Sequence, residues 1–206
     1  MASLGILGGT FNPPHLGHLV MGQEALDQLE LDRVLLMPVS DPPHKETEDD
    51  PGAAARVELC RLAVAGDERF AVSTLEIERG GPSYTIDTLR ELHASAPEHE
   101  LTFIVGGDMA YSLPSWREPA AVLELAHLAV AEREELRRSD IAARLASLAP
   151  PERIRFFDMP RMDLSSSAIR RRAAAGRPIR YLVPDAVATA IESRSLYRTA
   201  AGRPAA

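Results

Sequence analysis

The stretch that decides the expected fold is LGILGGTFNPPHLGH, residues 4–18. Its apolar start, residues 4–7, stops at Gly8 and Gly9, a pattern typical of a buried strand that ends in a tight turn. Apolar residues then recur at helical spacing over residues 17–29, which predicts a helix. The free N–H groups and the positive dipole end of such a helix face the glycine turn, so this junction is a candidate anion-binding site.

The rest of the chain repeats this alternation of strand and helix. We expect further strands near residues 33–38, 70–75, 101–105, 128–131 and 154–157, and helices near 53–65, 84–94, 118–125, 140–148, 166–175 and 184–192. The strands are continuous apolar runs, which indicates a parallel sheet covered on both faces. We therefore predict an α/β fold, a Rossmann-like doubly wound parallel sheet with helices on both faces. We expect a single domain over residues 1–198, helical from about residue 165, and a frayed tail at 199–206.

Composition excludes several classes of protein. The chain has 206 residues, a formal net charge of −7 and 45% hydrophobic residues, with a mean hydropathy of −0.13. These values argue against a disordered chain, a membrane span and broad nucleic-acid binding. The single cysteine, Cys60, excludes an intramolecular disulfide framework and fits a reducing compartment. With no recognisable signal peptide at the start, we expect a cytoplasmic protein.

Two histidines carry the strongest chemical signal. His15 and His18 are three positions apart, so a helical first turn places both imidazoles on one face. Two such donors can hold adjacent phosphate oxygens and stabilise the charge that develops in phosphoryl or nucleotidyl transfer. The alternative is a glycine turn with two solvent-exposed histidines. The sequence contains no P-loop motif. It also lacks the dinucleotide fingerprint G-x-G-x-x-G, which argues against a dehydrogenase.

A second signal lies in LSSSAIR, residues 164–170. Serines that begin a helix cap it and can donate to phosphate oxygens, and Arg170 adds a fork-shaped cation one turn later. Arg171 and Arg172 fit a solvated face better. The only lysine, Lys45, lies in a proline-rich and acidic segment, residues 40–52, that we expect to form a long loop. Arginines of residues 170–180 and Lys45 are expected to converge on one phosphate site.

These motifs resemble a known family. GGTFNPPHLGH together with LSSSAIR is similar to the nucleotidyltransferase superfamily that carries HxGH and a distal S-S-x-x-x-R element. PPHK (42–45), RGGPSYTIDTL (79–89), IVGGDMAYSLPSW (104–116) and IRYLVPDAVATAIESRSLY (179–197) resemble the bacterial nicotinate-nucleotide adenylyltransferases. The similarity runs from about residue 4 to 198. It implies that residues 1–198 form a nucleotidyltransferase domain.

The resemblance implies adenylyl transfer from ATP to nicotinate mononucleotide, with release of pyrophosphate and no covalent enzyme intermediate. It implies Mg²⁺ held by the triphosphate and water, and no metal site built by the protein. The catalytic residues it implies are His15, His18, Lys45 and Arg170. The ATP-binding residues are Gly8, Gly9, Thr10, Phe11, His15, His18, Gly106, Asp108, Ser166, Ser167 and Arg170. The acceptor-binding residues are Lys45, Tyr84, Thr85 and Trp116, whose indole would stack on the nicotinate ring.

Some positions depart from the family pattern or have simpler interpretations. Asn12, Pro14, Ser167 and Arg117 stand where the family often has Asp, Ile, Thr and an aromatic residue. Arg117 leaves the recognition of the nicotinate carboxylate open. Trp116 could instead plug a surface, Tyr84 and Thr85 could merely begin a helix, and Asp108 could be an N-cap. The rival functions are an adenylyltransferase for phosphopantetheine and a non-catalytic nucleotide sensor. The oligomeric state stays open, with a homodimer as one alternative.

Overall fold

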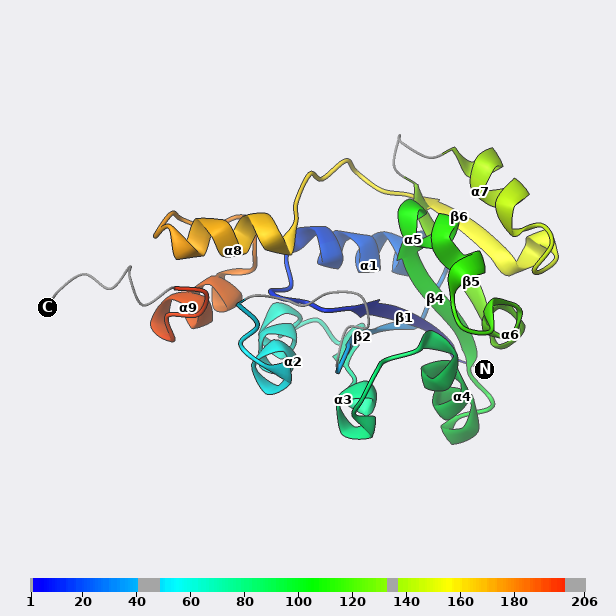
Figure 1. Cartoon of the computed structure of the whole chain (residues 1–206), viewed down its shortest axis with the longest axis horizontal. Coiled ribbons are helices and arrows are strands. Elements are labelled where there is room, and N and C mark those ends of the chain that lie inside the picture. The colour runs from blue at the N-terminus through cyan, green and yellow to red at the C-terminus, as the bar shows by residue number, and fades with distance from the viewer. Residues whose placement is uncertain (1, 41–48, 133–136, 199–206) are drawn as a thin grey trace, which may run out of the picture.

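The computed structural model describes residues 2–40, 49–132 and 137–198. Within them lies a six-stranded sheet in which every neighbouring pair of strands is parallel (Figure 1). The strand order is β3-β2-β1-β4-β5-β6, with bounds Ser3–Gly9 (β1), Arg33–Pro38 (β2), Phe70–Val72 (β3), Glu100–Gly106 (β4), Ala126–Glu132 (β5) and Ile154–Asp158 (β6). This is a doubly wound order, so the predicted Rossmann-like α/β fold is confirmed.

Helices cover both faces of the sheet. The helices are α1 (Leu16–Gln28), α2 (Ala53–Ala63), α3 (Leu75–Arg79), α4 (Thr85–Ser95), α5 (Gly107–Ser112), α6 (Pro119–Leu125), α7 (Arg138–Leu145), α8 (Ser166–Ala174) and α9 (Asp185–Ser193), with short 3-10 helices η1 (Leu113–Ser115) and η2 (Pro151–Arg153). Helices α1 and α2 contribute to the buried cluster on one face, and α4 to α7 contribute to the cluster on the other. None of the described helices is long and apolar enough to cross a bilayer.

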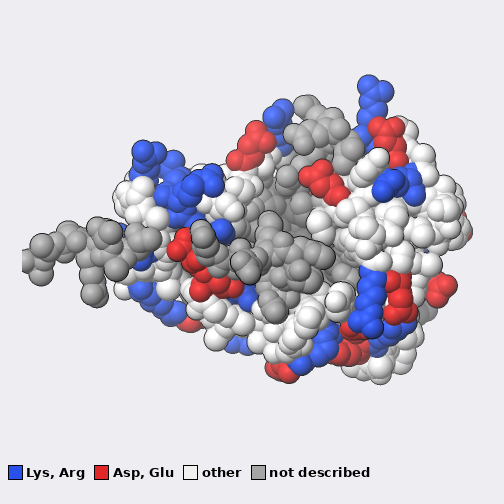
Figure 2. All heavy atoms as spheres, viewed as in Figure 1, with Lys and Arg blue, Asp and Glu red and all other residues white. Residues whose placement is uncertain are grey.

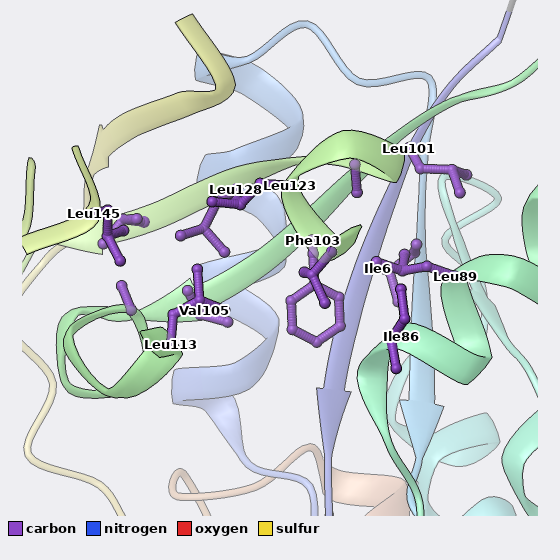
Figure 3. Packing of buried hydrophobic residues seen from close by; sticks show 14 of the residues in the cluster. Ile6, Ile86, Leu89, Leu101, Phe103, Val105, Leu113, Leu123, Leu128 and Leu145 are labelled. Carbon is purple, nitrogen blue, oxygen red and sulfur yellow. The ribbon is translucent and has the colours of Figure 1, made fainter. Parts of the chain in front are cut away.

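The two faces of β1 divide its side chains between two cores. Successive side chains of a strand point to opposite faces. Ile6 joins Ile86 and Leu89 of α4 in one cluster (Figure 3), whereas Leu7 joins Met21 of α1 in the other. Both faces are therefore apolar and buried, which explains why the strand reads as a continuous apolar run. Cys60 is fully buried in the second cluster, as its helical pattern indicates.

A third cluster connects the C-terminal helices to α2. Leu59 of α2 packs with Ile169 of α8 and with Val187 and Ile191 of α9. Figure 1 places α8 and α9 together at one end of the molecule, beside α2 and the start of α1. The packing brings the beginning of α8 to the loop between β1 and α1, residues 10–15, which we call the β1–α1 loop. The expected tail, residues 199–206, lies outside the described residues.

The expected tight turn at the two glycines is wrong. β1 continues through Gly8 and Gly9, and the left-handed residue is Phe11, with φ of 49°. A Cβ on Gly9 would lie only 3.3 Å from Cζ of Phe11, so glycine makes room for this ring rather than for a turn. The chain therefore changes direction at Phe11, after the two glycines and not at them.

Other element boundaries also differ. β3 ends at Val72, and residues 75–79 form the unpredicted helix α3. The N-cap of α4 is Tyr84, and the preceding Ser83 hydroxyl accepts the Ser40 N–H at 3.1 Å. α5 begins directly after β4, and its N-cap is Gly106, so the alternative of Asp108 as an N-cap is wrong.

Candidate active site

One cleft collects most of the residues that the sequence singles out. It has a volume of about 1820 Å³ and lies at the carboxyl ends of β1 and β4, where the strand order reverses. That crevice is where doubly wound sheets bind their ligands. The predicted residues that line it are Gly8, Gly9, Thr10, Phe11, His15, His18, Tyr84, Thr85, Gly106, Asp108, Trp116, Ser166, Ser167 and Arg170. The volume of the cleft exceeds the range of about 300–1,000 Å³ that is typical of a pocket for one small ligand.

The two histidines form a stacked pair at the start of α1. His15 is the N-cap and His18 the third helical residue, and the main-chain N–H of His15 donates to Nδ1 of His18 at 3.1 Å. The imidazole rings stack with centroids 3.8 Å apart, and Phe11 meets His18 edge-on at 4.9 Å. Because Nδ1 accepts this hydrogen bond, the proton of neutral His18 lies on Nε2. The fold therefore orients Nε2 of His18 as a donor, and the predicted arrangement of both rings on one face is confirmed.

Side chains at the start of α8 hold the β1–α1 loop by direct hydrogen bonds. Ser165 caps the helix by accepting from the N–H of Ala168 at 3.2 Å. Ser166 Oγ donates to the carbonyl of Pro13 at 2.8 Å, and Arg170 Nη1 donates to the carbonyl of Asn12 at 2.8 Å. Serine and arginine thus lie next to the histidine pair, and part of their hydrogen-bonding capacity is already used to join the two segments.

The arginine-rich stretch divides between the cleft and other places. Arg170 and Arg171 line the cleft, and Figure 2 shows arginine side chains gathered over α8. Arg172 donates to the carbonyl of Pro178 at 2.9 Å, and Arg180 pairs with Asp185 at 3.4 Å. Arg177 borders a separate cavity of about 150 Å³. The expected convergence of all these arginines on one phosphate site is therefore wrong. Lys45 lies outside the described residues.

The opposite end of the cleft is aromatic. Trp116 Nε1 donates to Ser112 Oγ at 3.1 Å, and the indole meets Phe103 edge-on at 6.0 Å, which fixes its orientation. Tyr84 and Thr85 lie at the start of α4, where main-chain N–H groups have no helical partners. A carboxylate or another anion is favoured at such a helix start.

Arg117 lies against this aromatic end. Its guanidinium carbon is 4.9 Å from the centre of the Tyr84 ring, and Nη1 is 3.5 Å from the Asp87 carboxylate. The side chain lines the cleft, so the residue that departs from the family pattern borders its aromatic end.

Two further buried polar residues near the cleft were not predicted from the sequence. Glu76 accepts from Thr88 Oγ1 at 2.6 Å, lines the cleft beside Tyr84, and its Oε2 has no hydrogen-bond partner among the described residues. Arg56 is 1% exposed and donates to Thr10. Both residues are charged side chains in segments that are otherwise partly apolar. Such side chains are buried only when they are paired, so a charge in such a segment could have pointed to a buried polar contact.

Comparison with known proteins agrees with this architecture. A doubly wound sheet with a cleft at its strand ends is an architecture that binds nucleotides. The family model that matches residues 6–172 of this chain is described as cytidylyltransferase-like. The chain is 41% identical to a protein of Geobacillus thermodenitrificans, in an alignment that covers 96% of this chain and 87% of the relative. It is 45% identical to one of a Synechococcus strain over 94% of each chain. Both carry the name "Probable nicotinate-nucleotide adenylyltransferase". The chain therefore belongs to the nicotinate-nucleotide adenylyltransferase family.

A solved structure shares the fold at low sequence identity. It is that of the Plasmodium falciparum nicotinic acid mononucleotide adenylyltransferase complexed with NaAD. The two chains are 15% identical, with a TM-score of 0.79 over 96% of this chain and 98% of that one. This similarity supports the fold of the chain.

Proposed function

We propose that this protein transfers the adenylyl group of ATP to nicotinate mononucleotide. An oxygen of the 5′-phosphate of the acceptor forms a bond to the α-phosphorus of ATP, and the bond from the α-phosphorus to the α–β bridging oxygen breaks. The products are nicotinate adenine dinucleotide and pyrophosphate. The observation that carries the proposal is the single cleft that joins the His15–His18 pair and the start of α8 to the aromatic pocket around Trp116.

The phosphate end of the cleft would bind ATP. Nε2 of His18 is directed as a donor and would stabilise the charge that develops on the α-phosphate, with His15 beside it. Ser166, Ser167 and Arg170 would hold the triphosphate. The main chain of Gly8, Gly9, Thr10 and Phe11 would line the nucleotide, and Gly106 and Asp108 would face the adenosine. These roles rest on position in the cleft and on hydrogen-bonding chemistry.

The aromatic end would bind the acceptor. The indole of Trp116, held by Ser112, would stack on the nicotinate ring, and main-chain donors at Tyr84 and Thr85 would meet its carboxylate. Lys45 would reach the phosphates from its loop. Holding both substrates in one orientation supplies most of the catalysis in such reactions, because no protein nucleophile is needed.

Mg²⁺ would arrive with ATP. Within the part of the chain that the structure describes, no group of three His, Cys, Asp or Glu side chains could form a metal cage. The donor set fits Mg²⁺ bound mainly by triphosphate oxygens and water, which is its usual coordination beside nucleotides. The positive charge of the ion would help to neutralise the phosphates during transfer.

The test is an acceptor comparison. Purified protein receives ATP, Mg²⁺ and one of three acceptors: nicotinate mononucleotide, its amide analogue or phosphopantetheine. We expect fastest pyrophosphate release with nicotinate mononucleotide. Preference for phosphopantetheine would instead favour the rival function, an adenylyltransferase that acts on phosphopantetheine. Binding of ATP without release for any acceptor would favour the nucleotide sensor.

A further inference from the structure

Arg56 is a buried cation that belongs to none of the motifs named in the sequence analysis. It lies on α2 and is 1% exposed. Removing a guanidinium from water is costly unless hydrogen bonds and opposite charges replace the lost solvation. Its surroundings must therefore supply several acceptors, and they do.

Four hydrogen bonds surround the Arg56 guanidinium. Nη1 donates to the carbonyls of Thr10 at 3.0 Å and Val39 at 2.7 Å, and Nη2 donates to the carbonyl of Ser40 at 3.0 Å. Nε donates to the carboxylate of Asp50 at 3.2 Å. Three of the four acceptors are main-chain carbonyls from segments that follow β1 and β2. A planar fork of five N–H donors can serve such a set, whereas the single ammonium of lysine cannot reach all of it.

These bonds fix the part of the chain that borders the nucleotide cleft. Thr10 is the first residue after β1, and the next residue, Phe11, has positive φ and meets the ring of His18 at 4.9 Å. A trans peptide directs its N–H opposite to its C=O, so the bond from Arg56 to the Thr10 carbonyl also directs the N–H of Phe11 away from α2. From the other side, α8 holds the carbonyls of Asn12 and Pro13. The β1–α1 loop is thus held by side chains of two helices.

We infer that Arg56 is a positioning residue for ATP: it holds the Thr10–Phe11 peptide and, through Phe11, the ring of His18 in the geometry that adenylyl transfer requires. The inference rests on the proposed function and adds a residue that touches neither substrate. Displacement of a catalytic group by about 1 Å can lower a rate by about 100-fold, so loss of this anchor has a large expected effect.

The test compares Arg56→Ala and Arg56→Lys with Leu59→Ala. Leu59 is on the same helix and fully buried, but packs in the cluster of α8 and α9 and is not among the residues that line the cleft. Each variant is assayed below its own melting temperature for kcat, for KM of ATP and of nicotinate mononucleotide, and for the Kd of ATP by calorimetry. Arg56→Ala is expected to lower kcat/KM for ATP by about 100-fold, and Arg56→Lys to recover only part of it. Leu59→Ala is expected to stay within a few-fold of wild type at comparable loss of melting temperature.

Chemical rescue separates positioning from general destabilisation. Guanidinium ion at tens of millimolar is expected to raise the activity of Arg56→Ala several-fold, whereas sodium at equal ionic strength does not. The inference is wrong if guanidinium gives no rescue, or if Arg56→Ala and Leu59→Ala lose kcat/KM equally. An inactive wild-type enzyme would instead contradict the proposed function, and the Kd of ATP would then decide the role of Arg56 alone. In that case an unchanged Kd in Arg56→Ala overturns the inference, and a Kd weakened at least tenfold supports it.

Discussion

Arg170 Nη1 donates a 2.8 Å hydrogen bond to the main-chain carbonyl of Asn12, 158 positions earlier in the chain. This bond joins the start of α8 to the β1–α1 loop, and the bond from Ser166 to Pro13 lies beside it. The two segments that resemble the family's distant motifs are therefore one hydrogen-bonded unit. A change in either segment is expected to alter the other.

Two neighbouring serines test this unit. Ser166→Ala removes the bond to Pro13, and Ser165→Ala removes the N-cap of α8. Each change is expected to cost about 1 kcal/mol of unfolding free energy, measured by urea denaturation. Only Ser166→Ala is expected to raise KM for ATP, because of the two serines only Ser166 has a hydrogen bond to the β1–α1 loop among the described residues. Equal effects of both changes on KM would show that the loss comes from helix stability.

Substitutions of His18 separate its structural role from its catalytic role. In His18→Asn the amide oxygen can still accept the His15 N–H, but no donor remains at the position of Nε2. We expect a fold of nearly wild-type melting temperature and a kcat lower by about 100-fold or more. His18→Ala should lose both the hydrogen bond from the His15 N–H and the activity. Near-normal kcat in His18→Asn would contradict the role of Nε2.

Trp116 is the only tryptophan, so its fluorescence reports on the aromatic end of the cleft. Stacking on the nicotinate ring is expected to quench this fluorescence when nicotinate mononucleotide is titrated, whereas ATP alone should change it little. Trp116→Ala should raise KM for the acceptor by about 10-fold, with Trp116→Phe in between. Quenching by ATP but not by nicotinate mononucleotide would contradict the stacking of Trp116 on the nicotinate ring and would place this residue beside ATP.

His127 of β5 predicts a pH dependence of stability away from the cleft. Burial, together with Arg155 and Arg153, lowers the pKa of His127 below its ordinary value of 6.5, while Glu100, 3.1 Å away, acts in the opposite direction. The unfolded chain then binds a proton at a higher pH than the folded one. Stability should therefore fall as the pH decreases from about 6.5 through the lower folded pKa.

The matched variant is His127→Gln, which cannot titrate. Its melting temperature should decrease less between pH 7 and pH 5 than that of wild type, and its activity at pH 7 should stay close to wild type, since His127 does not line the cleft. Parallel melting curves for the two proteins over this range would show that other groups cause the pH dependence.

The sequence predicted a parallel sheet with helices on both faces and a candidate anion-binding site where the first strand meets the first helix. Motifs such as those around Gly9, Gly106 and Ser166 follow strands or precede helices, and the carboxyl ends of parallel strands meet at one edge. Local periodicity is enough to place them there. The left-handed Phe11 was missed because its conformation depends on how its ring packs against Gly9.

The contacts that hold the cleft could not be predicted in this way. The bonds from Arg56 to Thr10 and from Ser166 to Pro13 join residues 46 and 153 positions apart. No periodic pattern encodes such pairs, because they arise when separate helices pack on the same loop. Nor does a cluster of arginines in sequence fix direction: α8 turns Arg170 toward the cleft and Arg172 toward Pro178.

The most direct test of the account is the stoichiometry of the reaction, followed by ³¹P nuclear magnetic resonance in one sample of protein, ATP, Mg²⁺ and nicotinate mononucleotide. We predict that each ATP consumed yields one pyrophosphate and one nicotinate adenine dinucleotide, and that His18→Asn slows the formation of both products equally. Pyrophosphate that appears with AMP in place of the dinucleotide, or ATP that stays intact beside the bound acceptor, would contradict it.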